Sequence, residues 1–220
     1  MTCKVFGVFG ASGFGREVMP VARGMDDLEG FDFVFVDDNP PAAEINGYKV
    51  LTYQEFVDVN ADVKSIIVAI ADAGIRRNIE ARCANDDIKL CTVVSEKSLK
   101  MDQVKIGDGA VICPFVTLTS NIKIGKSFHA NIYSYVAHDC VIGDYVTFAP
   151  AVKCNGNVKI ENNAYIGTGA IIKQGKPGKP LIIGEGAVVG MGAVVTKNVP
   201  AGAVVVGNPA KPLGHKRLGG

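Results

Sequence analysis

The sequence predicts an α/β N-terminal domain with a small Rossmann-like parallel sheet, followed by a parallel β-helix of hexapeptide repeats. Two observations support this. Apolar runs alternate with helix-like segments in the first half of the chain, which is typical of α/β folds. The second half has a six-residue period, which is typical of a triangular solenoid. Because the pattern changes near Ser95–Met101, we expect domains at residues 1–95 and 98–220.

The first domain is expected to contain four strands and three helices. Each strand is a short apolar run that ends in glycine, acidic or small residues, and the helices lie between them. The expected strands are Val5–Phe9, Phe33–Val36, Ser65–Ala71 and Leu90–Val94, and the expected helices are Arg16–Arg23, Tyr53–Asp58 and Ile75–Cys83. Alternation of this kind predicts a parallel sheet.

The repeat in the second half is regular. Steps of six residues from Ile106 to Ile172 meet an apolar residue at all twelve positions, and the register resumes at Ile183 after an insertion at residues 175–180. Each step is expected to form one short face and one corner, with the apolar residue stacked inside. The insertion is expected to protrude at a corner. Accidental alternation in a β-sandwich is the rival interpretation, and twelve in-register positions argue against it.

The composition argues against several classes of function. The 220 residues carry a net charge of +1, so no overall field favours nucleic acid or an anionic membrane. No apolar run reaches about 18 residues, which argues against a membrane span, and the N-terminus lacks the features of a signal peptide. Six cysteines are scattered without a CxxC pair. They predict reduced thiols in a cytoplasmic protein that binds no metal.

Two motifs of the first half indicate a nucleotide site. Gly10-Ala-Ser-Gly-Phe-Gly15 follows a strand and opens a helix, where free backbone N–H groups can hold a phosphate. Its GxxGxG spacing differs from the GxGxxG of dinucleotide-binding proteins, so a structural turn and an NAD site are the alternatives. Asp37 and Asp38 end the second strand, where an α/β sheet presents acids to a ribose. Their alternative is a solvated turn.

Only three histidines can serve as a general base. His215 lies in a basic tail, His129 has no acidic neighbour, and His138 is followed by Asp139 near a solenoid corner. Acyl transfer to an amine needs a base with a pKa near neutrality, and a carboxylate can orient its imidazole. His138 with Asp139 is therefore the candidate, although a lone histidine is often structural.

Several segments together resemble one family of enzymes. They are the glycine-rich turn at residues 10–15, Val36-Asp-Asp38, Val68-Ala-Ile70 followed by Ile75-Arg76, Ala137-His-Asp-Cys-Val-Ile-Gly143 and the hexapeptide repeats, with Gly-Asn-Pro-Ala-Lys211 after them. The chain resembles the nucleotide-4-aminosugar N-acetyltransferase and sialic-acid O-acetyltransferase family, which includes the acetyltransferase of bacillosamine synthesis. The resemblance implies a left-handed β-helix, a homotrimer, acetyl-CoA as co-substrate, and a nucleotide-aminosugar acceptor used in surface glycan synthesis.

The resemblance also implies roles for individual residues. His138 would be the base, Asp139 its partner in place of the more common glutamate, and Asn131 a nearby polar group, unless it only forms a corner ladder. Phe14 stands where many members have histidine. The substrate contacts would be Ser12, Gly13, Phe14, Asp37, Asp38 and Ala71, and the acetyl-CoA contacts would be Thr147, Thr168, Gly190 and Met191. Arg76 could meet a phosphate or cap the sheet.

The expected reaction is direct attack of the sugar amine on acetyl-CoA. Cys140 and Cys154 fall on inward steps of the repeat, which argues against an acetyl-enzyme. Three alternatives remain open from the sequence. They are O-acetylation of a sugar such as sialic acid, a non-catalytic β-helix trimer, and acetylation of serine or another small metabolite.

Overall fold

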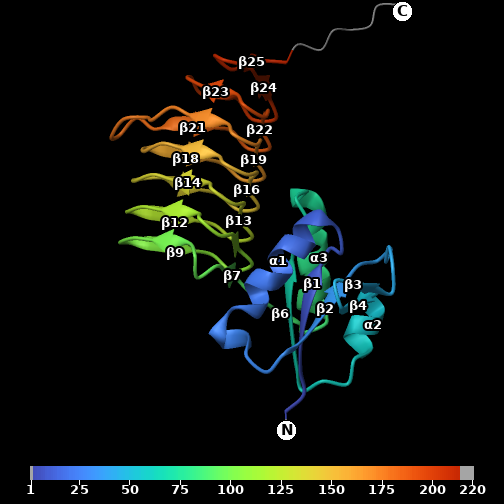
Figure 1. The fold of residues 1–220 in the computed structure, drawn as a ribbon. Coiled ribbons are helices and arrows are strands. Elements are labelled where there is room, and N and C mark those ends of the chain that lie inside the picture. The colour runs from blue at the N-terminus through green and yellow to red at the C-terminus, as the bar shows by residue number, and fades with distance from the viewer. Residues whose placement is uncertain (1, 214–220) are drawn as a thin grey trace, which may run out of the picture.

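The computed structural model describes residues 2–213, and the chain begins with an α/β unit (Figure 1). Its six-stranded sheet has the order β3-β4-β2-β1-β5-β6. The strands are β1 (Lys4–Phe9), β2 (Asp32–Val36), β3 (Glu44–Ile45), β4 (Tyr48–Leu51), β5 (Val63–Val68) and β6 (Lys89–Leu90). The helices are α1 (Gly13–Arg23), the 3₁₀ turn η1 (Asp26–Leu28), α2 (Tyr53–Asp58) and α3 (Ala73–Asn85). The expected strand–helix alternation is therefore present.

The central strands of this sheet are parallel and buried. β1 pairs with both β2 and β5, and Phe6, Val8 and Ile67 are fully enclosed. Strands covered on both faces read as continuous apolar runs, as these do. The short hairpin of β3 and β4 was not expected from the sequence. It turns at Asn46 and Gly47, which both have positive φ, as a two-residue type I′ turn requires.

The β-helix is a triangular prism with three faces, and it is left-handed. Face I contains β7 (Val93–Val94), β10 (Val111–Ile112), β13 (His129–Ala130), β16 (Thr147–Phe148), β19 (Tyr165–Ile166), β22 (Val188–Val189), β24 (Val204–Val206) and β25 (Lys211–Pro212). Face II contains β8 (Leu99–Lys100), β11 (Thr117–Leu118), β14 (Tyr135–Val136), β17 (Lys153–Cys154), β20 (Ile171–Ile172) and β23 (Val194–Val195). Face III contains β9 (Val104–Ile106), β12 (Ile122–Ile124), β15 (Val141–Ile142), β18 (Val158–Ile160) and β21 (Leu181–Ile183).

The six-residue repeat forms the interior of this prism. Ile112 pairs with Ala130 and Ala130 pairs with Phe148, so one coil takes three hexapeptides. The step positions are enclosed, apart from Ile106, which is half-buried at the first full coil. Such stacking buries a continuous core although each coil alone has none. The predicted period and its inward residues are confirmed.

The expected strand Leu90–Val94 is wrong as a single strand. Its first residue belongs to β6 in the α/β sheet and its last two form β7 on face I. The backbone N–H of Cys91 still bonds Ile66 in the α/β sheet, at 2.8 Å, whereas that of Val93 bonds Ala110 in the β-helix, at 2.8 Å. The apolar run is thus continuous in sequence but divided in space. Its first part lies in the α/β sheet and its last part in the β-helix.

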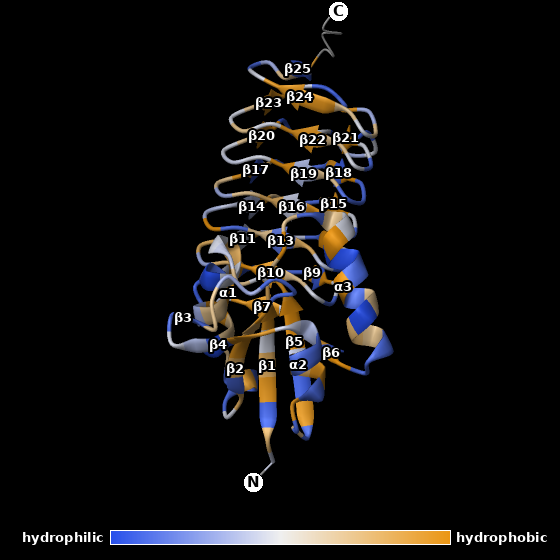
Figure 2. Ribbon diagram, turned by 90° about the vertical axis from the view of Figure 1, so that its right-hand side faces the viewer, coloured by the Kyte–Doolittle hydropathy of each residue, from blue (hydrophilic) through white to orange (hydrophobic). Residues whose placement is uncertain are grey.

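The α/β unit packs on one side of the prism. Figure 2 shows the face I strands rising from the α/β unit, with α1 and α3 on either side of the lower coils. Helix α1 contacts β7, and α3 bonds residues of face I and of the corner between faces III and I. Among residues 2–213, no helix is long and apolar enough to cross a membrane.

Candidate active site

His138 lies on the corner between faces II and III. It follows β14 of face II and precedes β15 of face III, and its side chain is 60% exposed. The next residue, Asp139, has a positive φ of 59°, and this turn brings its carboxylate to 2.7 Å from Nδ1 of the His138 ring. The shorter arm of aspartate therefore reaches the histidine. Asp144, another acidic residue nearby in sequence, accepts the backbone N–H of Lys126.

This pair has the geometry of an oriented general base. With Nδ1–H donated to Asp139, the other ring nitrogen, Nε2, is left as a proton acceptor. A carboxylate in this position fixes the tautomer and stabilises the imidazolium that forms when a proton is taken up. His138 and Asp139 are thus brought together as the sequence predicted.

The glycine-rich turn lies at the carboxyl end of β1. Gly10 has a φ of 109°, and a Cβ on Gly15 would collide with the carbonyl oxygen of Gly10, so only glycine fits at both positions. The Asp37 carboxylate accepts the backbone N–H of Ala11 at 3.0 Å and braces the turn. Helix α1 starts at Gly13, and the Ser12 side chain makes no cap bond. The first N–H groups of the helix can therefore meet an anion.

Asp38 behaves differently from Asp37. Its carboxylate is paired with Arg82 of α3 at 2.6 Å, and the Arg82 hydrogen bond lowers the pKa of Asp38. The Arg82 guanidinium also lies over the ring of Tyr53, 4.0 Å from its centroid. The predicted substrate contact of Asp38 would have to share this carboxylate with Arg82. That contact stays a prediction.

Arg76 joins the two units of the molecule and is fully buried. Its guanidinium donates to the carbonyls of Ile70, Ala71 and Tyr145 and to the Thr147 hydroxyl, at 2.7–3.0 Å. Burial lowers the pKa of Arg76 to about 10, so the side chain stays cationic at neutral pH. Of its two sequence-based interpretations, capping of the sheet fits this burial. The sequence contained no signal for its bonds to the β-helix.

His129 is the second buried group at this junction. Its Nδ1 lies 3.3 Å from Arg76, and the Phe14 ring packs on its imidazole at a centroid distance of 5.2 Å. Burial, followed by the nearby Arg76 charge, holds the pKa of His129 well below its usual range. His129 is therefore a neutral structural histidine. Phe14 packs against it and so contributes to the contact between the two units. His215 lies outside the described residues.

We expect His129 to make stability depend on pH. In the unfolded chain it takes up a proton near pH 6.5, whereas in the folded protein it does so only at much lower pH. The unfolded state then binds more protons, so the free energy of unfolding falls as pH drops below about 6.5, by at most about 1.4 kcal/mol per pH unit. Urea unfolding from pH 7.5 to 5 measures this. His129→Gln should show a shallower slope, and parallel curves would contradict the assignment.

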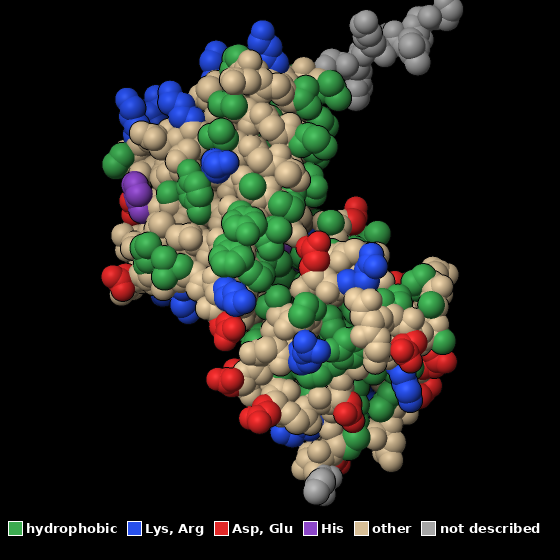
Figure 3. Space-filling model, in the orientation of Figure 1, with side chains coloured by type: hydrophobic (Ala, Val, Ile, Leu, Met, Phe, Trp, Pro, Cys, Tyr) green, Lys and Arg blue, Asp and Glu red, His purple; other side chains and the backbone are tan. Residues whose placement is uncertain are grey.

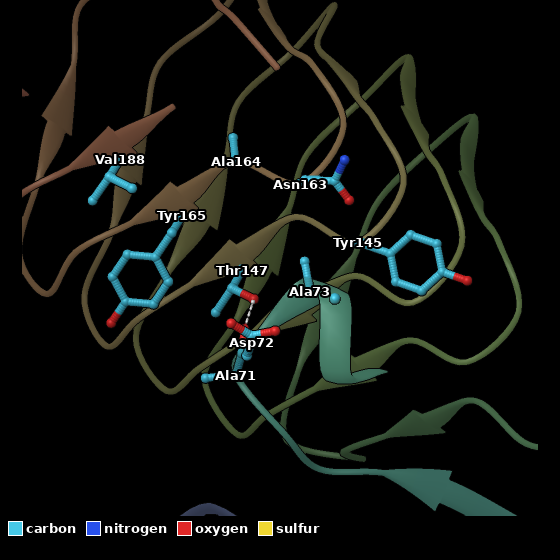
Figure 4. Close-up of a pocket in the computed structure, with 10 residues that line it drawn as sticks. Ala71, Asp72, Ala73, Tyr145, Thr147, Asn163, Ala164, Tyr165 and Val188 are labelled. Atoms are coloured by element: carbon cyan, nitrogen blue, oxygen red, sulfur yellow. Dashed lines mark hydrogen bonds between the residues drawn. The ribbon is translucent and has the colours of Figure 1, made fainter. Parts of the chain in front are cut away.

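A cavity of about 390 Å³ opens beside this junction (Figure 4). Ala71 and the start of α3 form one wall, and Thr147, Tyr165 and Val188 of face I form another. The Thr147 hydroxyl bonds the Ala71 carbonyl at 3.1 Å. Thr147 and Ala71, predicted for different ligands, thus meet directly. Thr147 is buried and its backbone N–H bonds the Ala164 carbonyl at 3.0 Å, so its contact with acetyl-CoA stays a prediction.

The remaining predicted residues lie on a third part of the prism, the corner between faces I and II. Asn131 follows β13 there, and its amide caps the Phe148 carbonyl of the next coil at 2.8 Å. Thr168 follows β19 at the same corner, and Gly190 and Met191 follow β22. Met191 is 80% exposed. One chain therefore holds the predicted residues in three separate places, and it does not bring Asn131 to His138.

The chain is similar to known proteins along almost its whole length. Residues 6–83 match the family described as the PglD N-terminal domain. A GDP-perosamine N-acetyltransferase from Escherichia coli O157:H7 is 51% identical over 213 residues, which cover 96% of each chain. The structure of WeeI from Acinetobacter baumannii AYE is 57% identical, with a TM-score of 0.92, and covers 96% of this chain and 100% of that one. The acetyltransferase domain of PglB from Neisseria gonorrhoeae FA1090, in complex with acetyl coenzyme A, is 28% identical with a TM-score of 0.84. This match covers 96% of this chain and 100% of that one.

Proposed function

Because the chain belongs to the nucleotide-4-aminosugar N-acetyltransferase family, we propose that it acetylates the amino group of GDP-perosamine. The identity of 51% along 96% of both chains is the observation that supports this substrate. The chain is an acetyl-CoA-dependent enzyme acting on a nucleotide-linked amino sugar for glycan synthesis. This excludes the non-catalytic β-helix trimer, which was one of the alternatives that the sequence left open. The choice of GDP and of perosamine is our proposal, and so is a cytoplasmic location.

The α/β unit would bind the nucleotide. The uncapped N-terminus of α1 offers backbone N–H groups and the positive end of the helix dipole to a pyrophosphate. Asp37 holds the turn that shapes this cradle, and Ser12 and Gly13 are exposed at its mouth. The sugar would extend from the cradle toward the cavity beside Ala71, away from the sheet.

We further propose that the active site is shared between chains of a homotrimer. The α/β unit is bonded to face I and to the corner between faces III and I, and His138 lies on the corner opposite face I. A sugar held by the α/β unit would therefore meet the His138 of a neighbouring chain. Two walls from two subunits can enclose ligands that one convex prism cannot.

Exposed apolar side chains support this arrangement. Phe115 and Tyr133 lie on the corner between faces I and II, are 51% and 61% exposed, and stack with ring centroids 5.1 Å apart. Figure 3 shows hydrophobic side chains gathered on the β-helix close to the α/β unit. Such a group on a soluble surface is typical of a protein interface or a ligand groove. Acetyl-CoA would lie along this corner, at Thr168 and Met191.

The chemistry follows from the exposed base. Nε2 of His138 takes a proton from the sugar amine while the amine nitrogen attacks the carbonyl carbon of the thioester. As the carbon–sulfur bond breaks, His138 returns this proton to the departing CoA sulfur. Backbone N–H groups of the coils would stabilise the oxyanion. Cys140 and Cys154 are enclosed inside the prism, which supports direct transfer without an acetyl-enzyme.

The nucleotide preference tests the proposed substrate. The same 4-amino sugar would be offered on GDP, UDP and dTDP with saturating acetyl-CoA, and release of the CoA thiol would be followed. We expect the highest kcat/KM with the GDP sugar. A preference for UDP or dTDP would contradict GDP-perosamine as the substrate while leaving the acetyltransferase assignment intact.

A further inference from the structure

We infer that Gly156 is a positioning residue for His138, an inference that rests on the proposed function of His138 as the base. Gly156 lies one coil beyond His138 at the same corner, eighteen residues later in the chain. It is buried and is not among the residues with positive φ. A structural need for positive φ therefore does not explain glycine at this position.

The space that a side chain would need at Gly156 is filled by the imidazole of His138. A Cβ there would lie 2.6 Å from both Cε1 and Nε2 of the ring and 3.0 Å from Nδ1, and these are its three nearest atoms. Other glycines of the coils, such as Gly125 and Gly167, would meet backbone atoms of the next coil among their nearest neighbours. Gly156 thus leaves room for a side chain that the reaction uses.

The backbone of Gly156 cannot withdraw from this contact. Its carbonyl accepts the N–H of Gly175 at 3.0 Å, and the N–H of the following Asn157 bonds the carbonyl of His138 at 3.0 Å. These bonds fix Gly156 between two coils. A methyl group added there would push the exposed imidazole outward, because its three nearest atoms all belong to that ring.

Moving the ring has two chemical consequences. It disturbs the 2.7 Å contact between Nδ1 and Asp139, which orients the base. It also shifts Nε2, the nitrogen that accepts the proton of the sugar amine, since the Cε1–Nε2 edge is the part of the ring against Gly156. A displacement of about 1 Å at a catalytic group can cost about 100-fold in rate. Binding of either substrate does not depend on this contact.

Gly156→Ala tests the inference by steady-state kinetics. We expect kcat to fall by about 10- to 100-fold, with the KM values for acetyl-CoA and the nucleotide sugar nearly unchanged. In a His138→Ala background the same change should have no further effect on the residual rate. Gly24→Ala at the end of α1, where a Cβ stays 3.5 Å or more from its neighbours, is the matched control and should keep full activity.

Thermal unfolding gives a readout that needs no substrate. Gly156→Ala should lower Tm in the wild-type background, and His138→Ala should remove that loss because the clashing ring is gone. Suppose that the Tm loss of Gly156→Ala depends on His138 but the protein acetylates no amino sugar. This result would overturn the proposed function and still support the contact between Gly156 and His138. An active wild type with an equally active Gly156→Ala, or an equal Tm loss in both backgrounds, would overturn the inference.

Discussion

Replacing His138 by alanine should lower kcat by about 100-fold or more, because a positioned general base contributes about 10²–10⁴ to the rate. The side chain is 60% exposed and, among residues 2–213, its only side-chain hydrogen bond is to Asp139, so the coil should fold as before. Steady-state kinetics with saturating acetyl-CoA and amino sugar measures the loss. Circular dichroism and Tm check that the fold is intact.

Two neighbouring carboxylates give this prediction a matched control. Asp139→Asn removes the charge beside Nδ1 and should lower kcat, though less than loss of the imidazole does. Asp144→Asn keeps the oxygen that accepts the Lys126 N–H and should leave kcat unchanged. Turnover of His138→Ala close to that of the wild type would refute the base assignment, and equal losses from both aspartates would refute the role of Asp139.

Mixing two inactive variants should restore activity if the site is shared between chains. One variant is His138→Ala. The other is Gly13→Asp, which sets a carboxylate at the start of α1 against the phosphates of the nucleotide. A Cβ at Gly13 meets nothing within 4 Å, and an acid suits the first turn of a helix, so this variant should fold.

The expected recovery follows from subunit statistics. After the two variants are unfolded together and refolded in equal amounts, a shared site is intact when an α/β unit from the first meets a His138 from the second. In a random trimer this holds for about one quarter of the sites, so about a quarter of wild-type activity should return. If each chain held a complete site, every site would carry one lesion and no activity would return.

The sequence was sufficient to predict the β-helix, because the physical cause of that fold is itself periodic. Each inward residue, from Ile112 to Val195, must be apolar to stack on the next coil, and the six-residue step records this directly. The glycine-rich turn was predictable for a similar reason, since only glycine fits at Gly10 and Gly15. The Asn46-Gly47 pair is typical of a two-residue hairpin turn, so the β3–β4 hairpin was also predictable from the sequence.

The junction between the units could not be predicted in the same way. Arg76 looks like an ordinary surface residue of a helix, and only the packing of α3 on face I reveals it as a buried cation bonded to carbonyls of both units. His129 likewise has no sequence feature that announces Phe14 as its neighbour. Contacts between elements far apart in the chain depend on docking, which local patterns do not encode. For the same reason, the sequence could not predict that one chain holds the predicted site residues in three separate places.

The most direct test of the central claim is the reaction itself. GDP-perosamine and acetyl-CoA would be incubated with the purified protein, with thiol release and product mass followed together. We expect one thiol per sugar, a product heavier by one acetyl group on nitrogen, and no turnover of the matching GDP sugar that has a hydroxyl in place of the amine. Acetylation of the hydroxy sugar at a comparable rate, or no thiol release with the amino sugar, would contradict the account.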